Sequence, residues 1–277
     1  MDGREGVADM LTQPQIAEFR ERGFLLLGPV MRREEAVGLK KRLDDVLDGK
    51  SQAEPELKRN LLGETESVVV QVVNIWEADD LFREHIYNPA VCAAVADLIP
   101  ADTLRVWHDQ IQYKPPKVGG PTNWHQDHPY WPIIQPADLV SAWVALEDAD
   151  VENGCMWMVP RSHRWGPHKN GTIGTIADGF VPDYDPAQVP AGERVEWVPC
   201  PVRAGEAMFH HCLTWHGSPP NRSERGRPAI AVHYMPGYTR YEPVSGHVME
   251  RRVSVQPGEI LQGEYFPTVW DRGPVPH

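Results

Sequence analysis

A histidine and an aspartate stand two residues apart near the middle of the chain, at His125 and Asp127. In a β-strand, residues two apart point to the same face, so the pair can present an imidazole and a carboxylate to one metal ion. A second histidine would complete a two-histidine, one-carboxylate set, which leaves positions open for O2 and a chelating cosubstrate and suits Fe(II). His216 is the candidate, because it closes the strand-like run 207–216 and is followed by turn residues.

A His-x-Asp pair alone is weak evidence for a metal, because a chain with 12 histidines can contain such a pair in a surface turn. Arg227, which follows His216 by 11 residues, strengthens the interpretation. It stands directly before the run 228–235 and shares a strand face with two small alanines, which leave room for a ligand. A guanidinium can hold a carboxylate through two parallel hydrogen bonds. The alternative is a solvated arginine in a basic loop, which is how we interpret Arg222 and Arg225.

Polar side chains near the motif are candidates for substrate contacts. Gln110 and Gln112 share one strand face and could bind a polar substrate, or they could be structural amides whose hydrogen bonds are satisfied within the protein. Tyr130 and Trp131 follow the motif and could line the mouth of the site, or they could simply pack in the core.

Three other histidines, His210, His211 and His233, are interpreted as neighbours of the site or as bystanders. His210 has the strand parity of His216, but nothing in the sequence spacing pairs it with a carboxylate.

The N-terminal third reads as alternating helices and strands. Thr12 is a candidate N-cap before Pro14, and Gly23 ends that helix. The pattern then predicts a strand at 24–27, a helix at 34–47 with Val37, Leu39 and Leu43 in its apolar stripe, a polar loop at 49–60, a strand at 68–75 and a helix at 79–99 with Leu81 buried.

From residue 104 the pattern changes to short apolar runs separated by Gly, Pro, Asn and Asp, which indicates a β-sandwich or barrel. The runs are 104–113, 122–128, 139–146, 155–159, 195–198, 207–216 and 228–235. We expect a mainly β fold of jelly-roll type with flanking N-terminal helices, in a single domain over 1–277. A helical and mixed buttress would span about 12–100, the β core about 104–240 and a C-terminal extension 241–277. The irregular segment 168–192, rich in Gly, Pro and Asp, would suit a lid.

Composition excludes some partners. The net charge is −12, and the longest dense basic stretch, 222–227, is interrupted by Glu224, so nucleic acid and anionic membranes are not expected partners. No apolar run reaches the length of a membrane span, and no signal core is seen. The four cysteines lack close pairing, which favours free thiols and a cytoplasmic protein. We expect a small-molecule substrate and see no sign of an obligatory protein partner.

Several motifs in order, from about Pro14 to Met235, resemble the phytanoyl-CoA dioxygenase family. They are Phe19 with Gly23-Phe24, Lys114-Pro115-Pro116, Trp124-His125-Gln126-Asp127, Trp143 with Asp148, Asn153-Gly154-Cys155, Pro160-Arg161-Ser162-His163, and His216-Gly217-Ser218 with Arg227.

The resemblance implies a double-stranded β-helix, also described as cupin-like, with His125, Asp127 and His216 as Fe(II) ligands. It implies 2-oxoglutarate as cosubstrate, with its distal carboxylate on Arg227, and O2 as oxidant. The same comparison places Trp143, Ser218 and Gln126 beside 2-oxoglutarate, and Gln71 where some members have a basic residue. The implied reaction releases succinate and CO2 while a substrate is hydroxylated or otherwise oxidised.

The retained carboxylate of Asp127 disfavours halogenation, because halogenating relatives replace it with a small residue. The polar strand face favours a small metabolite or a natural-product intermediate as substrate. Two alternatives stay open: a non-catalytic metabolite-binding protein, and a cupin-like metal enzyme without a cosubstrate.

Overall fold

The N-terminal helix forms between the residues that were expected to bound it. A computed structural model describes residues 11–168, 174–175, 183–184, 186–244 and 246–272. Helix α1 (Gln13–Arg22) begins after Thr12, whose backbone N–H donates to the Gln15 side chain over 2.8 Å, and it ends at Gly23, whose φ of 82° is left-handed. Glycine adopts that conformation without steric cost.

Strand β1 (Phe24–Pro29) and helix α2 (Arg33–Leu47) follow. The buried stripe of α2 is Ala36, Leu39, Leu43 and Val46. The expectation for Val37 was wrong: its side chain is 57% exposed, because it lies about 100° around the helix from Ala36.

Three further expectations in this region are corrected. The predicted loop 49–60 contains strand β2 (Leu57–Asn60), which pairs with β3 (Val70–Val73). The predicted helix 79–99 is two helices, α4 (Asp80–Ile86) and α5 (Pro89–Leu98), preceded by the short α3 (Ile75–Ala78). The break comes at Asn88, whose side chain accepts from the N–H groups of Ala90 and Val91 and so starts a new helix. Leu81, expected in the core, is 38% exposed.

The remainder is mainly antiparallel sheet, as expected. The larger sheet has the order β1-β12-β7-β14-β4-β3-β2, with β16 also paired to β4, and the smaller has the order β11-β8-β13-β5. The strands of the larger sheet not yet bounded are β4 (Thr103–Lys114), β7 (Val140–Ala145), β12 (Glu206–His211), β14 (Arg227–Pro236) and β16 (Thr268–Asp271). The smaller sheet comprises β5 (Thr122–His125), β8 (Met156–Met158), β11 (Val198–Cys200) and β13 (His216–Ser218).

Short elements complete the described residues. Two-stranded ladders join β6 (Ile134–Gln135) to β15 (Arg240–Tyr241) and β9 (Gly174–Thr175) to β10 (Asp183–Tyr184). The 3-10 turns are η1 (His128–Tyr130), η2 (Ser162–Trp165), η3 (Pro186–Gln188) and η4 (Val248–Arg252).

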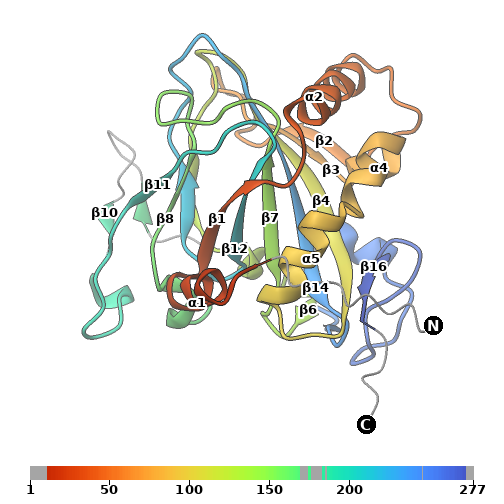
Figure 1. Ribbon diagram of the computed structural model, residues 1–277, viewed down its shortest axis with the longest axis vertical. Coiled ribbons are helices and arrows are strands. Elements are labelled where there is room, and N and C mark those ends of the chain that lie inside the picture. Colours follow the sequence, from red (N-terminus) through yellow and green to blue (C-terminus); the bar gives the residue numbers. More distant parts are fainter. Residues whose placement is uncertain (1–10, 169–173, 176–182, 185, 245, 273–277) are drawn as a thin grey trace, which may run out of the picture.

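Strand β14 shows how the larger sheet divides the core. Ile230 and Val232 pack on the side of the helices, in the cluster that contains Leu39 of α2. Ala229 and Ala231 face the other way, into the cluster with Met156 and Met158 of the smaller sheet. The sheet therefore has helices on one side and the smaller sheet on the other, and Figure 1 shows β8 and β11 to the left with α2, α4 and α5 to the right. The inner side between the two sheets is where the candidate site lies.

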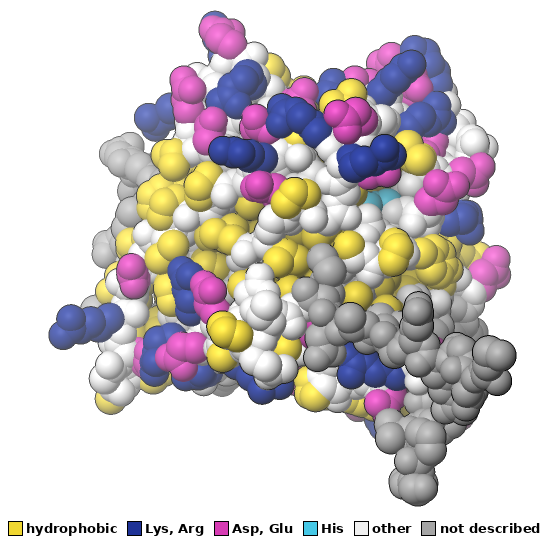
Figure 2. All heavy atoms as spheres, viewed as in Figure 1, with side chains coloured by type: hydrophobic (Ala, Val, Ile, Leu, Met, Phe, Trp, Pro, Cys, Tyr) yellow, Lys and Arg dark blue, Asp and Glu magenta, His cyan; other side chains and the backbone are white. Residues whose placement is uncertain are grey.

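Surface features are consistent with the composition. Figure 2 shows Lys and Arg intermingled with Asp and Glu around an apolar stretch on the viewed face. All four cysteines are buried and free. Among the described residues, no helix is both long and apolar enough to cross a bilayer.

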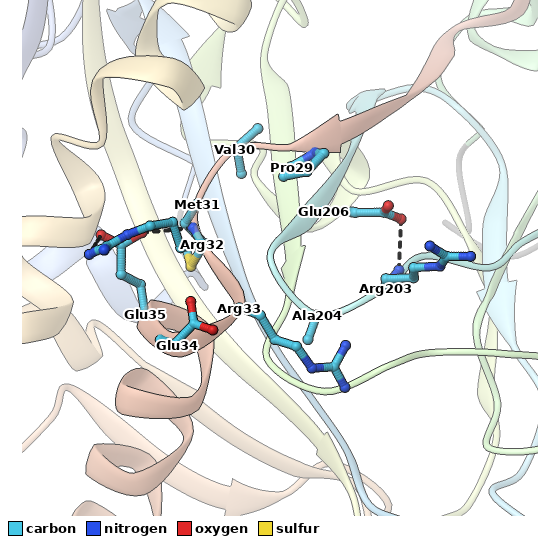
Figure 3. A pocket seen from close by; sticks show the side chains of 10 residues that line it. All are labelled: Pro29, Val30, Met31, Arg32, Arg33, Glu34, Glu35, Arg203, Ala204 and Glu206. Carbon is cyan, nitrogen blue, oxygen red and sulfur yellow. Dashed lines mark hydrogen bonds and ion pairs between the residues drawn. The ribbon is translucent and has the colours of Figure 1, made fainter.

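A surface pocket of about 700 Å³ lies where β1 leads into α2, against the turn at 203–206 (Figure 3). Its charged lining is Arg32, Arg33, Glu34, Glu35, Arg203 and Glu206. Arg32 pairs with Glu35 at 2.9 Å, and Arg33 pairs with Asp148 at 2.8 Å. None of the residues singled out from the sequence lines it.

Candidate metal centre

His125, Asp127 and His216, here called the triad, offer ligand atoms that all lie within 4.8 Å of one another. His125 ends β5 and His216 begins β13, and the two are opposite each other in the antiparallel ladder of the smaller sheet. Their ring centroids are 4.1 Å apart. Strand pairing thus brings together two imidazoles that are far apart in the sequence.

Asp127 reaches the site from a turn. The strand expected at 122–128 ends at His125, and Asp127 has helical dihedral angles (φ −71°, ψ −48°) at the start of η1. The backbone N–H groups of Asp127 and His128 both donate to the Cys212 carbonyl, over 2.9 and 3.1 Å, which holds the turn against the larger sheet. The strand-parity argument for this pair was therefore wrong in its geometry, although Asp127 Oδ1 lies 3.5 Å from Nε2 of both His125 and His216.

The run 207–216 is also not one strand. It divides into β12 of the larger sheet and β13 of the smaller, with the turn 212–215 between them. His216 therefore starts a strand rather than closing one. This crossing places the residues before and after the turn in the two different sheets of the sandwich.

The two histidines of the triad are oriented by backbone carbonyls. His125 Nδ1 lies 2.7 Å from the Asn123 carbonyl, and His216 Nδ1 lies 2.9 Å from the Thr214 carbonyl. A carbonyl can only accept, so Nδ1 carries the proton in both rings and the Nε2 lone pairs face Asp127. This is the arrangement that metal-binding histidines need.

The electrostatics favour the metal-binding forms of His125 and Asp127. Burial, followed by the neighbouring His216, lowers the pKa of His125. Burial raises the pKa of Asp127, but the imidazoles of His216, His125 and His210 outweigh it and hold that pKa well below its usual range. The site therefore pairs a carboxylate with a neutral imidazole.

The other carboxylate oxygen of Asp127 has two partners that the sequence spacing did not indicate. Oδ2 lies 3.0 Å from His210 Nε2 on β12 and accepts from Ser141 Oγ on β7 over 3.1 Å. The expectation that nothing pairs His210 with a carboxylate is corrected by the fold, because the turn that carries Asp127 is bonded to the Cys212 carbonyl, two residues after His210. No signal in the sequence indicated this contact, because the run that gave His210 and His216 a shared parity is divided between two sheets.

Arg227 is completely buried, with 0% exposure. None of its three guanidinium nitrogens has a hydrogen-bond partner among the described residues. Its Cζ lies 5.2 Å from the centroid of Trp143, a residue that is itself buried on β7. Burial lowers the pKa of Arg227 to about 10. A buried charge with no partner is costly, so this geometry fits a guanidinium that awaits an anion.

Lys114 adds a second buried cation beside Arg227, its register partner on β4. Its ammonium donates to the carbonyls of Ser218 over 3.1 Å and Pro219 over 2.7 Å. Burial, followed by the charge of Arg227, lowers the pKa of Lys114 well below its usual range. Lys114 thereby ties the end of β13, two residues after His216, to the strand opposite Arg227.

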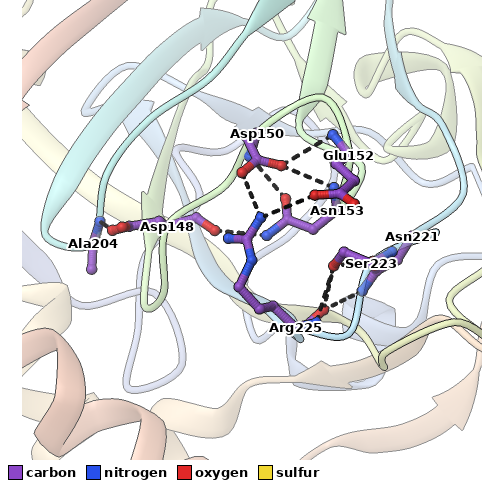
Figure 4. A network of polar contacts seen from close by, with 8 residues as sticks. All are labelled: Asp148, Asp150, Glu152, Asn153, Ala204, Asn221, Ser223 and Arg225. Atoms are coloured by element: carbon purple, nitrogen blue, oxygen red, sulfur yellow. Dashed lines mark hydrogen bonds and ion pairs between the residues drawn. The ribbon is translucent and has the colours of Figure 1, made fainter.

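A polar network between two loops braces this region (Figure 4). The Asn221 amide donates to the carbonyls of Lys114, Pro115 and Arg225. Arg225 in turn pairs with Asp150 at 2.6 Å. The Asn153 amide donates to the Asp148 carbonyl. The family-like residues Asp148 and Asn153 are thus part of the support for the segment that leads to Arg227.

The glutamines flagged from the sequence divide into two groups. Both N–H bonds of the Gln126 amide go to carbonyls, of Gly166 and Leu213, and its oxygen accepts from the His168 N–H. The amide of Gln126 is thus engaged by backbone groups, and its contact with the cosubstrate stays a prediction. Gln71 and Gln110 are hydrogen-bonded to each other, whereas Gln112 is half-buried next to them on β4.

The two aromatic residues after the motif also differ. Tyr130 is 53% exposed, and its ring centroid lies 6.0 Å from that of His125, at the rim of the triad. Trp131 is buried and packs edge-on against His108 and His233. Trp131 therefore has the core-packing role that was its alternative. Most of the segment 168–192, considered as a lid, lies outside the described residues.

Comparisons with known proteins agree with this geometry. The sequence model of phytanoyl-CoA dioxygenase (PhyH) matches residues 19–229. A probable phytanoyl-CoA dioxygenase of Caenorhabditis elegans is 30% identical over 269 residues, covering 89% of this chain and 82% of the relative.

Solved structures with the same fold include two from nogalamycin biosynthesis. The non-heme alpha-ketoglutarate-dependent carbocyclase SnoK is 28% identical, with a TM-score of 0.77 over 93% of this chain and 96% of that one. The epimerase SnoN, solved with Fe3+, alpha-ketoglutarate and nogalamycin RO, is 23% identical with a TM-score of 0.73, over 93% and 98% of the two chains, a likeness of fold. The double-stranded β-helix expected from the sequence is confirmed.

Proposed function

The chain belongs to the phytanoyl-CoA dioxygenase family of Fe(II)- and 2-oxoglutarate-dependent oxygenases, and we propose on this basis that it couples oxidation of a small molecule to decarboxylation of 2-oxoglutarate. The observation that carries the proposal is the joint presence of the triad and the buried, unpartnered Arg227 on the inner side of the same sandwich. A binding protein without catalysis would have no use for both.

In this proposal the triad holds Fe(II). His125 and His216 contribute their Nε2 lone pairs, and Asp127 contributes Oδ1, the oxygen that faces both rings. Two histidines and one carboxylate leave the remaining positions to exogenous ligands. When bound, the iron supplies the centre at which O2 and 2-oxoglutarate react to give succinate, CO2 and an oxidised substrate.

Arg227 is the residue we assign to the distal carboxylate of 2-oxoglutarate. Its nitrogens are all without partners among the described residues, and a guanidinium matches a carboxylate through two parallel bonds. Lys114 raises the positive potential beside it. The ring of Trp143 packs against the guanidinium. Ser218 follows His216 by two residues, and its carbonyl accepts a hydrogen bond from Lys114.

The contribution of the protein is to bind, orient and exclude water. The carbonyls of Asn123 and Thr214 keep the ligand rings in one tautomer. The apolar and aromatic residues between the sheets keep the carboxylate pocket dry, which strengthens its electrostatic grip on an anion. Tyr130, at the rim, and Gln112, half-buried on β4, are the residues we assign to substrate contact.

The substrate we propose is a small metabolite or a natural-product intermediate, and the reaction is hydroxylation or a related oxidation. The 28% identical carbocyclase from nogalamycin biosynthesis supports a natural-product substrate. Asp127 occupies the ligand position that a halogenating enzyme must vacate for chloride. Hydroxylation, desaturation, ring closure and epimerisation all use the same protein ligands, so the substrate decides between them.

The first test is the visible spectrum of anaerobic protein with Fe(II) and 2-oxoglutarate. Chelation of the iron by 2-oxoglutarate should give a weak charge-transfer band, which should be lost in His216→Ala and weakened in Arg227→Met. Candidate substrates are then screened by succinate release. Iron-loaded protein that shows no band with saturating 2-oxoglutarate would refute the cosubstrate assignment.

A further inference from the structure

A row of polar side chains crosses the inner side of the larger sheet and ends at the triad. It runs from Arg59 on β2 to Gln71 on β3, Gln110 on β4, His233 on β14, Ser141 on β7 and finally Asp127. We call these six residues the transverse chain. The strands β2, β3, β4, β14 and β7 are consecutive neighbours in the sheet, so strand pairing builds the row as far as Ser141, and the turn before η1 adds Asp127.

The hydrogen bonds at the outer end of the transverse chain can run in only one donor-to-acceptor direction. Arg59 Nε donates to Gln71 Oε1 over 2.8 Å, and a guanidinium has no acceptor, so the amide oxygen of Gln71 must point outward. Its amide nitrogen then points inward and donates to Gln110 Oε1 over 2.5 Å. The same logic turns the amide nitrogen of Gln110 toward His233.

This orientation decides the tautomer of His233. Gln110 Nε2 lies 3.0 Å from His233 Nε2, and the amide nitrogen can only donate, so this ring nitrogen must accept. The proton of the neutral ring is then on Nδ1, which lies 2.7 Å from Ser141 Oγ. Ser141 accepts that proton and gives its own single hydroxyl proton to Asp127 Oδ2, 3.1 Å away.

Both ends of the transverse chain therefore demand the same direction, because it starts at an obligatory donor and ends at a carboxylate, an obligatory acceptor. We propose that Gln110, His233 and Ser141 are positioning residues of the metal site, which hold Asp127 Oδ2 away from the metal so that the carboxylate binds through Oδ1 alone. His210, on β12, donates to the same Oδ2 from the next strand.

Both ring nitrogens of His233 are occupied in this arrangement. The ring is buried on the face of β14 that carries Arg227, with Nε2 on Gln110 and Nδ1 on Ser141. The inference rests on the proposed function only in taking Asp127 as a metal ligand.

The direct test is the tautomer of His233 in the metal-free, full-length protein. In 15N-labelled protein, long-range 1H–15N spectra distinguish a protonated from a bare ring nitrogen, and His233→Gln assigns the signals. We expect Nδ1 protonated and Nε2 bare. A His233 ring protonated at Nε2 would overturn the direction of the transverse chain, whether or not iron or 2-oxoglutarate binds.

Two variants separate a directional chain from mere packing. Gln110→Glu offers only acceptors to His233 and should draw a proton to Nε2. Gln110→Met keeps the length and should leave Nδ1 protonated, because the Asp127 end still sets the same direction through Ser141. A packing role for Gln110 predicts the wild-type ring spectrum in Gln110→Glu as well, and that result would overturn the proposal.

The link to the metal is tested by Fe(II) affinity, measured in anaerobic titrations. Ser141→Ala should weaken it about tenfold, the usual effect of removing a hydrogen bond to a metal ligand. The matched control is Thr239→Val, because Thr239 is fully buried and its hydroxyl has no partner among the described residues. Folded Ser141→Ala with affinity within about twofold of wild type would overturn the positioning role. Wild-type protein that binds no Fe(II) would instead refute the proposed function, while the tautomer result still decides the direction of the transverse chain.

Discussion

Lys114 and Arg227 lie opposite each other on β4 and β14, and both side chains are fully buried. Lys114 is satisfied by two carbonyls, but Arg227 has no hydrogen-bond partner among the described residues. Two positive side chains buried side by side repel each other, and without cosubstrate no anion compensates them. The pocket should therefore favour binding of an anion.

From this pair we predict opposite effects of Arg227→Met on stability and on binding. Removing an unpaired buried charge should stabilise the cosubstrate-free protein by about 1–3 kcal/mol. The same variant should no longer be stabilised by 2-oxoglutarate, which at 100 times its Kd adds about 2.7 kcal/mol to a protein that binds it. Chemical unfolding with and without 2-oxoglutarate, under anaerobic Fe(II), measures both effects. Equal stabilisation of variant and wild type by 2-oxoglutarate would contradict the assignment of Arg227.

The triad predicts a stoichiometric metal site that depends on each ligand. His216→Ala should abolish retention of one Fe(II) per chain after desalting, because two remaining ligands hold a divalent ion weakly. His163→Gln is a suitable control, since His163 bonds to the Arg20 carbonyl outside the triad. Elemental analysis checks the iron content. If His216→Ala retained its iron, the triad would not be the iron site.

The close packing of Gly154 against Pro219 should affect the pocket around Lys114 and Arg227. Its φ is +83°, and an added Cβ would lie 2.5 Å from the Pro219 carbonyl, which accepts from Lys114. Gly154→Ala should therefore destabilise the protein by about 1–3 kcal/mol and also weaken 2-oxoglutarate binding. Gly258→Ala, with φ +81° and open space around the added atom, isolates the backbone effect. If the two variants lose equal stability in urea unfolding, the contact with Pro219 has no energetic role.

The buried His85 should account for part of the loss in unfolding free energy at acidic pH. Burial lowers its pKa from 6.5 to about 4. The unfolded chain therefore binds more protons between pH 6.5 and 4, and the stability present above pH 6.5 is lost as the pH falls through this window. By linkage the loss at pH 5 is roughly 2 kcal/mol.

The measurement is the unfolding free energy of metal-free protein at pH 7 and pH 5, for wild type and His85→Leu. The leucine variant should lose less stability on acidification by about the stated amount. An identical pH dependence in the two proteins would show that His85 is not a buried neutral ring in solution.

Short-range patterns in the sequence were sufficient for the candidate ligands and the fold class. The triad was named from a two-residue spacing and a later histidine, and the carbonyls that orient both rings lie two residues before each of them. Capping residues likewise bounded α1. These features depend on backbone geometry within a few residues, which local sequence largely determines.

Only the tertiary structure decided which atoms of the triad face the metal and which groups hold the carboxylate. His210 is 83 residues from Asp127, and His233 is 92 residues from Ser141, yet each pair is in hydrogen-bond contact. The break of the run 207–216, the backbone bonds of Gln126 and the complete burial of Arg227 were equally hidden. The reason is physical: strand order and register set these contacts, and a register is selected by the packing of a whole sheet face rather than by any local pattern.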